Sequence, residues 1–198
     1  MGTAAAIWTS RDGLEWRRAD VEQTPSPAVR FTSIQSLVAF HGNVVGYGSA
    51  DSSGNVGIEG VGGRLTPTGT AQPAVWISSD GGRWTAVSPV TYRINTLSYS
   101  GPIVATDDEL IALGEELVVD EVTGGHSINF ELRSMDGIVW TRRDLDLAGA
   151  RTAAAFANGV AVALGDATDQ WAAMLAGGTY DPDEITARAA SVWILPTD

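Results

Sequence analysis

The fold is decided by the stretch Ser78-Ser79-Asp80-Gly81-Gly82-Arg83-Trp84, which follows the apolar run Val75-Trp76-Ile77. Its pattern, Ser-x-Asp-Gly-x-x-Trp, occurs again at residues 10–16 and 134–140. In each copy a Trp or Leu lies eight residues before the final Trp, so the spacing is repeated as well as the letters. A further copy starts at Ser191-Val192-Trp193-Ile194-Leu195, without the turn that follows in the other copies.

Each complete copy has the chemistry of a β-hairpin corner. Asp-Gly between two β-rich runs is a strong hairpin signal, because Gly adopts a positive φ and the Asp carboxylate accepts hydrogen bonds from turn amides. The Trp on the returning strand can cover the turn. We therefore expect structural roles for the Ser, Asp and Trp of all three copies: Ser10, Asp12, Trp16, Ser78, Asp80, Trp84, Ser134, Asp136 and Trp140.

Strand-sized runs recur around these hairpins in a constant order, four to a unit. Residues 30–40 and 44–48 are expected strands joined by a turn, and residues 93–99 and 110–114 repeat that plan. Self-similar units of four strands are typical of a β-propeller. We predict an all-β chain, a partial or open propeller of antiparallel blades forming one segment over residues 1–198: a leading half blade at 5–20, blades at 28–89 and 92–145, and an incomplete blade at 150–198.

The Ser-x-Asp-Gly-x-x-Trp pattern resembles the Asp-box, or BNR, repeat of the sialidase-like propellers, although it is one residue shorter between Asp and Trp. The resemblance implies that the boxes join the third and fourth strands of a blade, away from the ligand face. It also implies that ligands bind on other loops. In this chain those loops are expected at Ser49–Gln72, Glu115–Ser127 and Asp166–Ala190.

The three expected loops are rich in carboxylates, which gives two interpretations. A cluster of acidic residues at Asp181, Asp183 and Glu184 offers the oxygens that calcium prefers, but it lacks the spaced Asp/Asn-Gly pattern of a calcium loop, which favours a solvated acidic rim. Trp171 and Tyr180 could stack on a sugar ring or fold back on the protein. We expect a protein or carbohydrate ligand on this surface and no obligatory cofactor, with calcium as the alternative.

A catalytic alternative rests on Tyr92-Arg93-Ile94-Asn95, which resembles the motif whose Arg grips the substrate carboxylate in sialidases. Here Asn95 replaces the usual Pro. Arg30 and Arg151 stand in similar places in the neighbouring units, so Arg93 is also explained as a feature of the repeat. We therefore expect a noncatalytic binding or scaffold module, and keep a sialidase-like glycoside hydrolase fragment using Arg93 as the alternative.

Composition narrows the class of partner. The formal net charge of −12 argues against nucleic acid and anionic membrane surfaces, because phosphates would be repelled. The absence of Cys excludes disulfides and thiolate sites. The sequence has no signal peptide and no run near the roughly 20 apolar residues of a membrane span. All twelve basic residues are Arg, which is typical of GC-rich bacterial genomes. We expect an extracytoplasmic location.

The number of units leaves closure of the ring open. Propellers commonly have about four to eight blades, more than the sequence supplies. One solution is a strand-exchanged homodimer, in which residues 14–19 complete the blade that ends at 192–195. The other is a longer chain with further blades.

Overall fold

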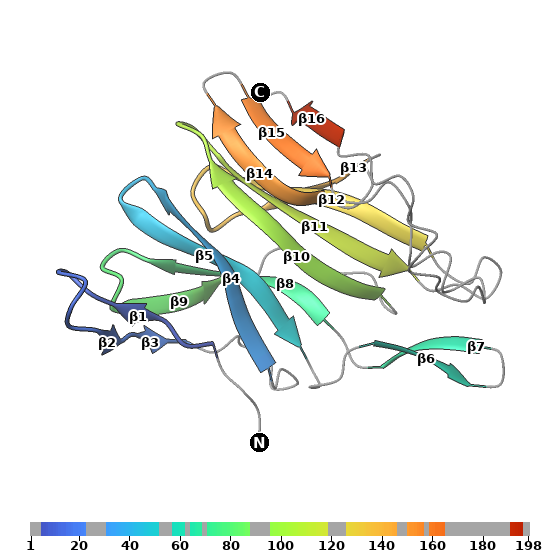
Figure 1. Cartoon of the computed structure of the whole chain (residues 1–198), viewed down its shortest axis with the longest axis horizontal. Helices are drawn as coiled ribbons and strands as arrows, with labels where there is room; N and C mark the ends of the chain where they lie inside the picture. Colours follow the sequence, from blue (N-terminus) through green and yellow to red (C-terminus); the bar gives the residue numbers. More distant parts are fainter. Residues whose placement is uncertain are drawn as a thin grey trace.

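The computed structural model describes residues 5–22, 31–51, 57–61, 64–68, 71–87, 96–118, 126–145, 150–156, 159–164 and 191–195. These residues form sixteen strands and no helix, which confirms the all-β prediction. Within the same residues, no helix has the length and apolarity that a membrane crossing requires. The strands form three larger sheets and two small hairpins (Figure 1).

The first sheet has the strand order β3-β9-β8-β5-β4. Its antiparallel part comprises β4 (Phe31–Phe40), β5 (Asn43–Asp51), β8 (Ala71–Ser78) and β9 (Arg83–Val87). The fifth strand, β3 (Asp20–Val21), comes from the start of the chain and runs parallel to β9. The parallel edge strand was not expected from the sequence.

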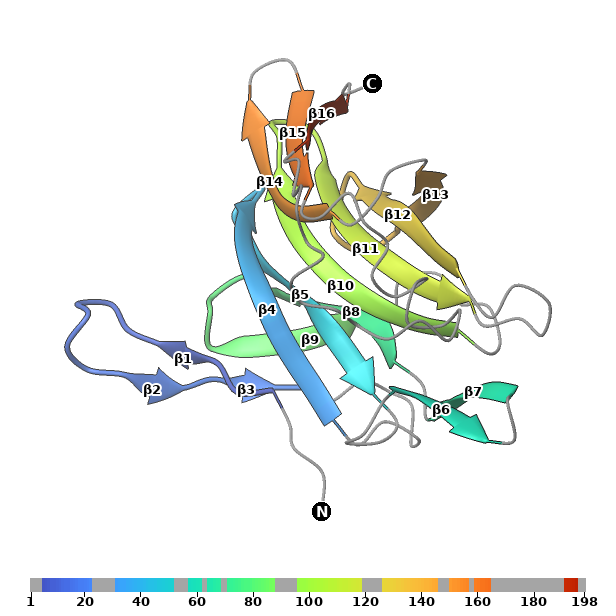
Figure 2. The same cartoon turned by 45° about the vertical axis from the view of Figure 1, so that its right-hand side comes forward.

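Two further sheets follow in chain order, each an antiparallel meander. The second sheet comprises β10 (Thr96–Ala105), β11 (Leu110–Val118), β12 (His126–Ser134) and β13 (Thr141–Leu145). The third sheet comprises β14 (Ala150–Phe156), β15 (Gly159–Leu164) and β16 (Ser191–Leu195). Figure 2 shows the three sheets succeeding one another, with β4, β10 and β14 side by side.

The N-terminal hairpin, residues 5–22, contains β1 (Trp8–Thr9) paired with β2 (Arg17–Arg18). The chain then enters the first sheet as β3, where the Asp20 amide donates to Gly82 O (2.8 Å) and the Glu22 amide to Trp84 O (2.8 Å). The expected half blade at 5–20 thus forms a two-stranded sheet of its own, and β3 attaches it to the edge of the first sheet. Residues 14–19 do not complete the third sheet within this chain, because Arg17 and Arg18 of β2 pair with β1.

Two of the expected loops contain strands. Residues 49–72 include β6 (Gly57–Val61) and β7 (Arg64–Thr68), which pair as a hairpin, as well as the end of β5 and the start of β8. Residues 115–127 were also predicted as a loop, but β11 continues through Val118 and β12 begins at His126. The prediction was wrong at both ends of this range, because Glu115 and Glu116 pair with β12 within the sheet. The third expected loop, 166–190, lies outside the described residues.

The first sheet is covered on both faces, which explains the nearly continuous burial along β5 and β8. Val75 belongs to the core cluster shared with the second sheet, which includes Phe130, Leu132 and Trp140. Its neighbour Trp76 belongs to the cluster shared with the N-terminal hairpin. Adjacent residues on β8 thus serve opposite interfaces, because side chains alternate across a strand.

A close backbone approach fixes the register between β4 and β5. The register shifts between Ile34 and Ser36, so that Gln35 is the extra residue of a β-bulge. Opposite the bulge lies Gly48, where a Cβ atom would be 1.8 Å from the Ser33 carbonyl oxygen. Only glycine fits at this position without separating the two strands.

We expect Gly48→Ala to lower the free energy of unfolding by at least about 3 kcal/mol, because backbone atoms have to move to admit the methyl group. Gly82→Ala is the matched control: the nearest atom to its Cβ is Asp80 Oδ1 at 3.6 Å, an ordinary contact. The control should change stability by no more than about 0.5 kcal/mol. Urea unfolding measures both, and equal midpoints would contradict the register described.

Candidate functional site

The three Asp-Gly turns share one hydrogen-bonding scheme. In the second copy Asp80 Oδ1 accepts from the Gly82 amide (2.8 Å), the Arg83 amide (3.0 Å) and the Ser78 hydroxyl (3.2 Å). The Ser78 hydroxyl oxygen accepts from the Gly81 amide at 2.9 Å. The Trp84 indole Nε1 donates to Gly81 O at 3.0 Å, which fixes the ring beside the turn. Every residue type in the pattern therefore has a partner inside the turn.

The other two copies repeat this scheme with equivalent residues. Asp12 accepts hydrogen bonds from the amides of Leu14 and Glu15 and from the Ser10 hydroxyl. Asp136 accepts from the amides of Ile138 and Val139 and from the Ser134 hydroxyl, so the donors are equivalent in all three copies. The indoles of Trp16 and Trp140 again donate to the turn glycine, at 3.2 and 3.0 Å. The turn glycines all have φ between 71° and 76°. The pattern thus produces the same corner three times.

These hydrogen bonds set the ionisation of the turn carboxylates. Backbone amides lower the pKa of Asp80 below its ordinary value, Arg83 first and Gly82 second, with a smaller contribution from Ser78. The pKa values of Asp12 and Asp136 are lowered in the same way by their own turn amides. A carboxylate held ionised by its own backbone is poorly suited to general acid or base catalysis, which needs a pKa near the working pH.

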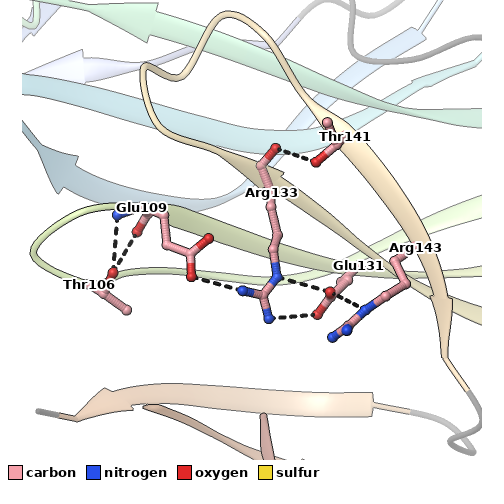
Figure 3. A network of polar contacts seen from close by, with 6 residues as sticks. All are labelled: Thr106, Glu109, Glu131, Arg133, Thr141 and Arg143. Carbon is pink, nitrogen blue, oxygen red and sulfur yellow. Dashed lines mark hydrogen bonds and ion pairs between the residues drawn. The ribbon is translucent and has the colours of Figure 1, made fainter. Parts of the chain in front are cut away.

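A second polar feature, a charged network, lies on the face of the second sheet (Figure 3). The buried carboxylate of Glu131 accepts from Arg133 Nε at 2.9 Å and from Arg143 Nε at 2.7 Å. Arg133 also reaches Glu109 Oε1 at 2.9 Å, and the Glu109 amide donates to Thr106 Oγ1 at 3.1 Å. In Figure 3 an orange-tinted strand passes below these side chains, in agreement with the contact between β10 and β14. The network therefore lies between the second and third sheets.

A third polar feature is the ion pair of Glu116 with Arg142. Glu116 is fully buried on β11, and its Oε2 accepts from Arg142 Nη2 at 2.6 Å. The guanidinium also contacts Asp144 at 2.9 Å and lies 4.3 Å from the centroid of the Phe130 ring. Burial opposes the charge of Arg142, but the hydrogen bonds that its guanidinium donates to Glu116 and Asp144 outweigh burial and raise the pKa of the guanidinium.

Sequence reasoning missed both ion-pair groups. The signal was available in β13, Thr-Arg-Arg-Asp-Leu, where charged residues stand at positions that the first sheet fills with apolar side chains. Glu116 was instead assigned to a solvated acidic rim, and its complete burial overturns that assignment for this residue.

Most of the predicted ligand-binding and catalytic residues lie outside the described residues: Arg30, Arg93, Trp171, Tyr180, Asp181, Asp183 and Glu184. Arg151 is the exception, because its backbone lies in β14. It stands between Ala150 and Thr152, where the register shifts, and so takes the bulge position that Gln35 has in β4. Because Arg30 and Arg93 lie outside the described residues, their expected equivalence with Arg151 stays a prediction.

Metal-binding and histidine chemistry find little support in the described ranges. No group of three or more His, Cys, Asp or Glu side chains there could hold a metal ion. His41 stacks on Phe40 with ring centroids 3.9 Å apart, and its Nε2 lies 3.0 Å from Asp107 O. His126 opens β12 in the second sheet. His41 thus lies in the turn between β4 and β5, whereas His126 belongs to the second sheet.

Comparison with known proteins does not add a family: no family model, curated protein or solved structure matches the chain.

The turn carboxylates predict an acid-sensitive stability. Their pKa values are lower in the folded chain than the unfolded value of about 3.9, so their stabilisation is complete above that pH and is lost as the pH falls through the folded pKa values. Asp80→Asn keeps an oxygen acceptor without the charge. We expect this variant to be less stable at pH 7 and to lose less stability on acidification than the wild type.

Thermal unfolding between pH 7 and pH 3 measures this effect, with Asp108→Asn as the control. Asp108 is an exposed carboxylate in the turn between β10 and β11. Its variant should follow the wild-type curve. If Asp80→Asn also follows that curve at every pH, the turn carboxylate does not stabilise the fold as its hydrogen bonds indicate.

The buried ion pair gives a separate prediction. Arg142→Met leaves the Glu116 carboxylate buried without its guanidinium, and such a loss costs about 3–5 kcal/mol. The double variant Glu116→Gln with Arg142→Met should recover part of that cost. Arg83→Met is the control, because Arg83 is exposed on β9 and should tolerate the change within about 0.5 kcal/mol. Equal stability of Arg142→Met and Arg83→Met in urea would contradict the role of the pair.

Proposed function

We propose that this chain is a noncatalytic binding scaffold built from β-propeller blades of the Asp-box type. Three features support the proposal. Each larger sheet contains a meander of antiparallel strands, the first strands β4, β10 and β14 are neighbours, and successive sheets pack face to face (Figure 2). Four-stranded sheets arranged around a common centre are the propeller plan.

The observation that carries the noncatalytic part is that the turn carboxylates, the strongest sequence motif, are engaged within their own turns. Glu131 and Glu116 are also engaged, since each is buried and ion-paired to arginine between or beside sheets. Such groups hold the sheets together and do not offer an acid and a nucleophile to a substrate. Their engagement favours a scaffold over an enzyme.

The proposal includes a ligand surface on the segments that do not repeat, above all 166–190. It takes a protein or a carbohydrate as the ligand, together with an extracytoplasmic location, in line with the Asp-box resemblance. The sialidase-like alternative depends on Arg93 and is favoured by the sequence Tyr92-Arg93-Ile94 together with the Asp-box turns. A direct activity measurement separates the two functions.

We expect no turnover of a fluorogenic sialoside or of a panel of other fluorogenic glycosides by the full chain. The reason is that the three turn carboxylates, Glu116 and Glu131 are held in turns or in ion pairs. Turnover that is lost in Arg93→Ala and kept in Arg83→Ala would replace the scaffold with the hydrolase. Turnover that survives Arg93→Ala would indicate a hydrolase of another kind.

A further inference from the structure

The N-terminal hairpin exposes two tryptophans whose counterparts in the first sheet are buried. Trp16 is 57% exposed, whereas the aligned Trp84 is 2% exposed. Trp8 is also 57% exposed, whereas the aligned Trp76 is fully buried. The Trp16 indole still donates to Gly13 O, so the corner is formed in the same way and only its cover is missing.

In the first sheet the cover is the N-terminal hairpin. Trp76 and Trp84 lie in one buried cluster with Ile7 and Ala19 of the hairpin. The contact is direct, because the Trp76 indole Nε1 donates to the Glu22 carbonyl at 3.1 Å. The two tryptophans of a unit thus face the unit that comes before it in the chain.

The tryptophan-equivalent positions of the second sheet are covered by the first sheet, which again is the preceding unit in the chain. Leu132 and Trp140 stand at the positions of Trp76 and Trp84, and both are buried in a cluster with Val75 of β8. Each interface therefore uses the same positions on both sides, since Val75 stands where the hairpin has Ile7.

The turn glycines also face the unit that precedes their own in the chain. A Cβ on Gly81 would lie 3.5 Å from Thr9 Cγ2 of the hairpin, and a Cβ on Gly137 would lie 3.3 Å from Ile77 Cδ1 of the first sheet. Thr9 and Ile77 are again aligned positions. A Cβ on Gly13 would have no atom within 4 Å among the described residues. The turn at Gly13 has the same shape as the turns that pack against the strands of Thr9 and Ile77. No described segment packs against it.

The other end of the chain repeats the sequence that covers a corner. Val192 and Ile194 in β16 align with Val75 and Ile77, which cover the second sheet. In both views β16 lies at the opposite end of the molecule from the N-terminal hairpin (Figures 1 and 2). The third sheet of one chain therefore does not reach Trp8 and Trp16 of the same chain.

Charge also suits a contact between copies. The hairpin, residues 5–22, carries three of the twelve Arg residues, all exposed, and four of the 24 carboxylates. It is nearly neutral in a chain of net charge −12. An acidic second copy meets less repulsion here than it would elsewhere on average, so apolar burial can dominate the contact.

From these observations we infer that the face bearing Trp8 and Trp16 binds a second copy of this chain, head to tail. The third sheet of the second copy covers the two tryptophans as the first sheet covers Leu132 and Trp140. The contact stacks one sheet face on another and exchanges no strand. The inference deepens the proposed scaffold function and rests on it, but association and glycoside turnover are separate measurements and fail independently.

Analytical ultracentrifugation of the full chain over a range of concentrations tests the association. We expect the mass to rise above that of one chain, and Trp8→Ser with Trp16→Ser to weaken association by more than about tenfold, as buried interface tryptophans do. The double variant should still fold, as far-UV circular dichroism can check, because both side chains are more than half exposed. Leu14→Ser is the control: Leu14 is 84% exposed, and its counterpart Ile138 stays exposed beside a covered corner.

A wild type that stays monomeric at all concentrations, or a double variant that associates like Leu14→Ser, would overturn the inference. The orientation needs a cross-link, for which the chain is suited because it has no cysteine. Leu14→Cys labelled with a benzophenone maleimide keeps both tryptophans. We expect a photo-cross-link to residues 150–164 or 191–195 of another copy. A cross-link to residues 5–22 of another copy, or only within one chain, would exclude the head-to-tail contact.

Discussion

The hydrogen bond from each corner tryptophan to its turn glycine links local chemistry to long-range packing. In the third copy the bond from Trp140 to Gly137 O holds the indole beside the turn, while the absence of a Cβ lets Gly137 come close to Ile77 of the preceding sheet. The Asp136 carboxylate keeps the turn in the one conformation that serves both purposes. A seven-residue pattern therefore determines how its own hairpin folds and also which neighbour it touches.

The interfaces between successive sheets differ in chemistry although their geometry repeats. The first and second sheets meet through aromatic and aliphatic side chains, and Tyr47 adds a hydrogen bond from its hydroxyl to Leu113 O at 3.1 Å. The second and third sheets are separated by the network around Glu131 and Arg133 (Figure 3). Apolar burial is tolerant of small shifts, whereas buried ion pairs are costly unless every partner is in place. The second interface is thus the more demanding of the two.

Sequence reasoning succeeded where structure is local. The Asp-Gly corners were predicted from residue types alone, because the pattern contains all the donors and acceptors that close the turn. It failed where distant segments meet. The parallel pairing of β3 with β9 joins residues more than sixty positions apart, and nothing in Asp20-Val21 distinguishes it from an ordinary connector. Burial of Glu116 likewise depends on Arg142 from another strand, so the same letters suggested a solvated loop.

The charged network also restricts which sheet can pack against the second sheet. Glu131 and Arg133 occupy the positions that Val75 and Ile77 hold one unit earlier. A sheet that rests on Val75 and Ile77 presents an apolar face, and the same face placed over Glu131 would strip water from the carboxylate without offering it a new partner. The repeated units therefore share a backbone plan but are not interchangeable. The side chains at these two positions of one strand therefore determine which neighbouring sheet can pack against each unit.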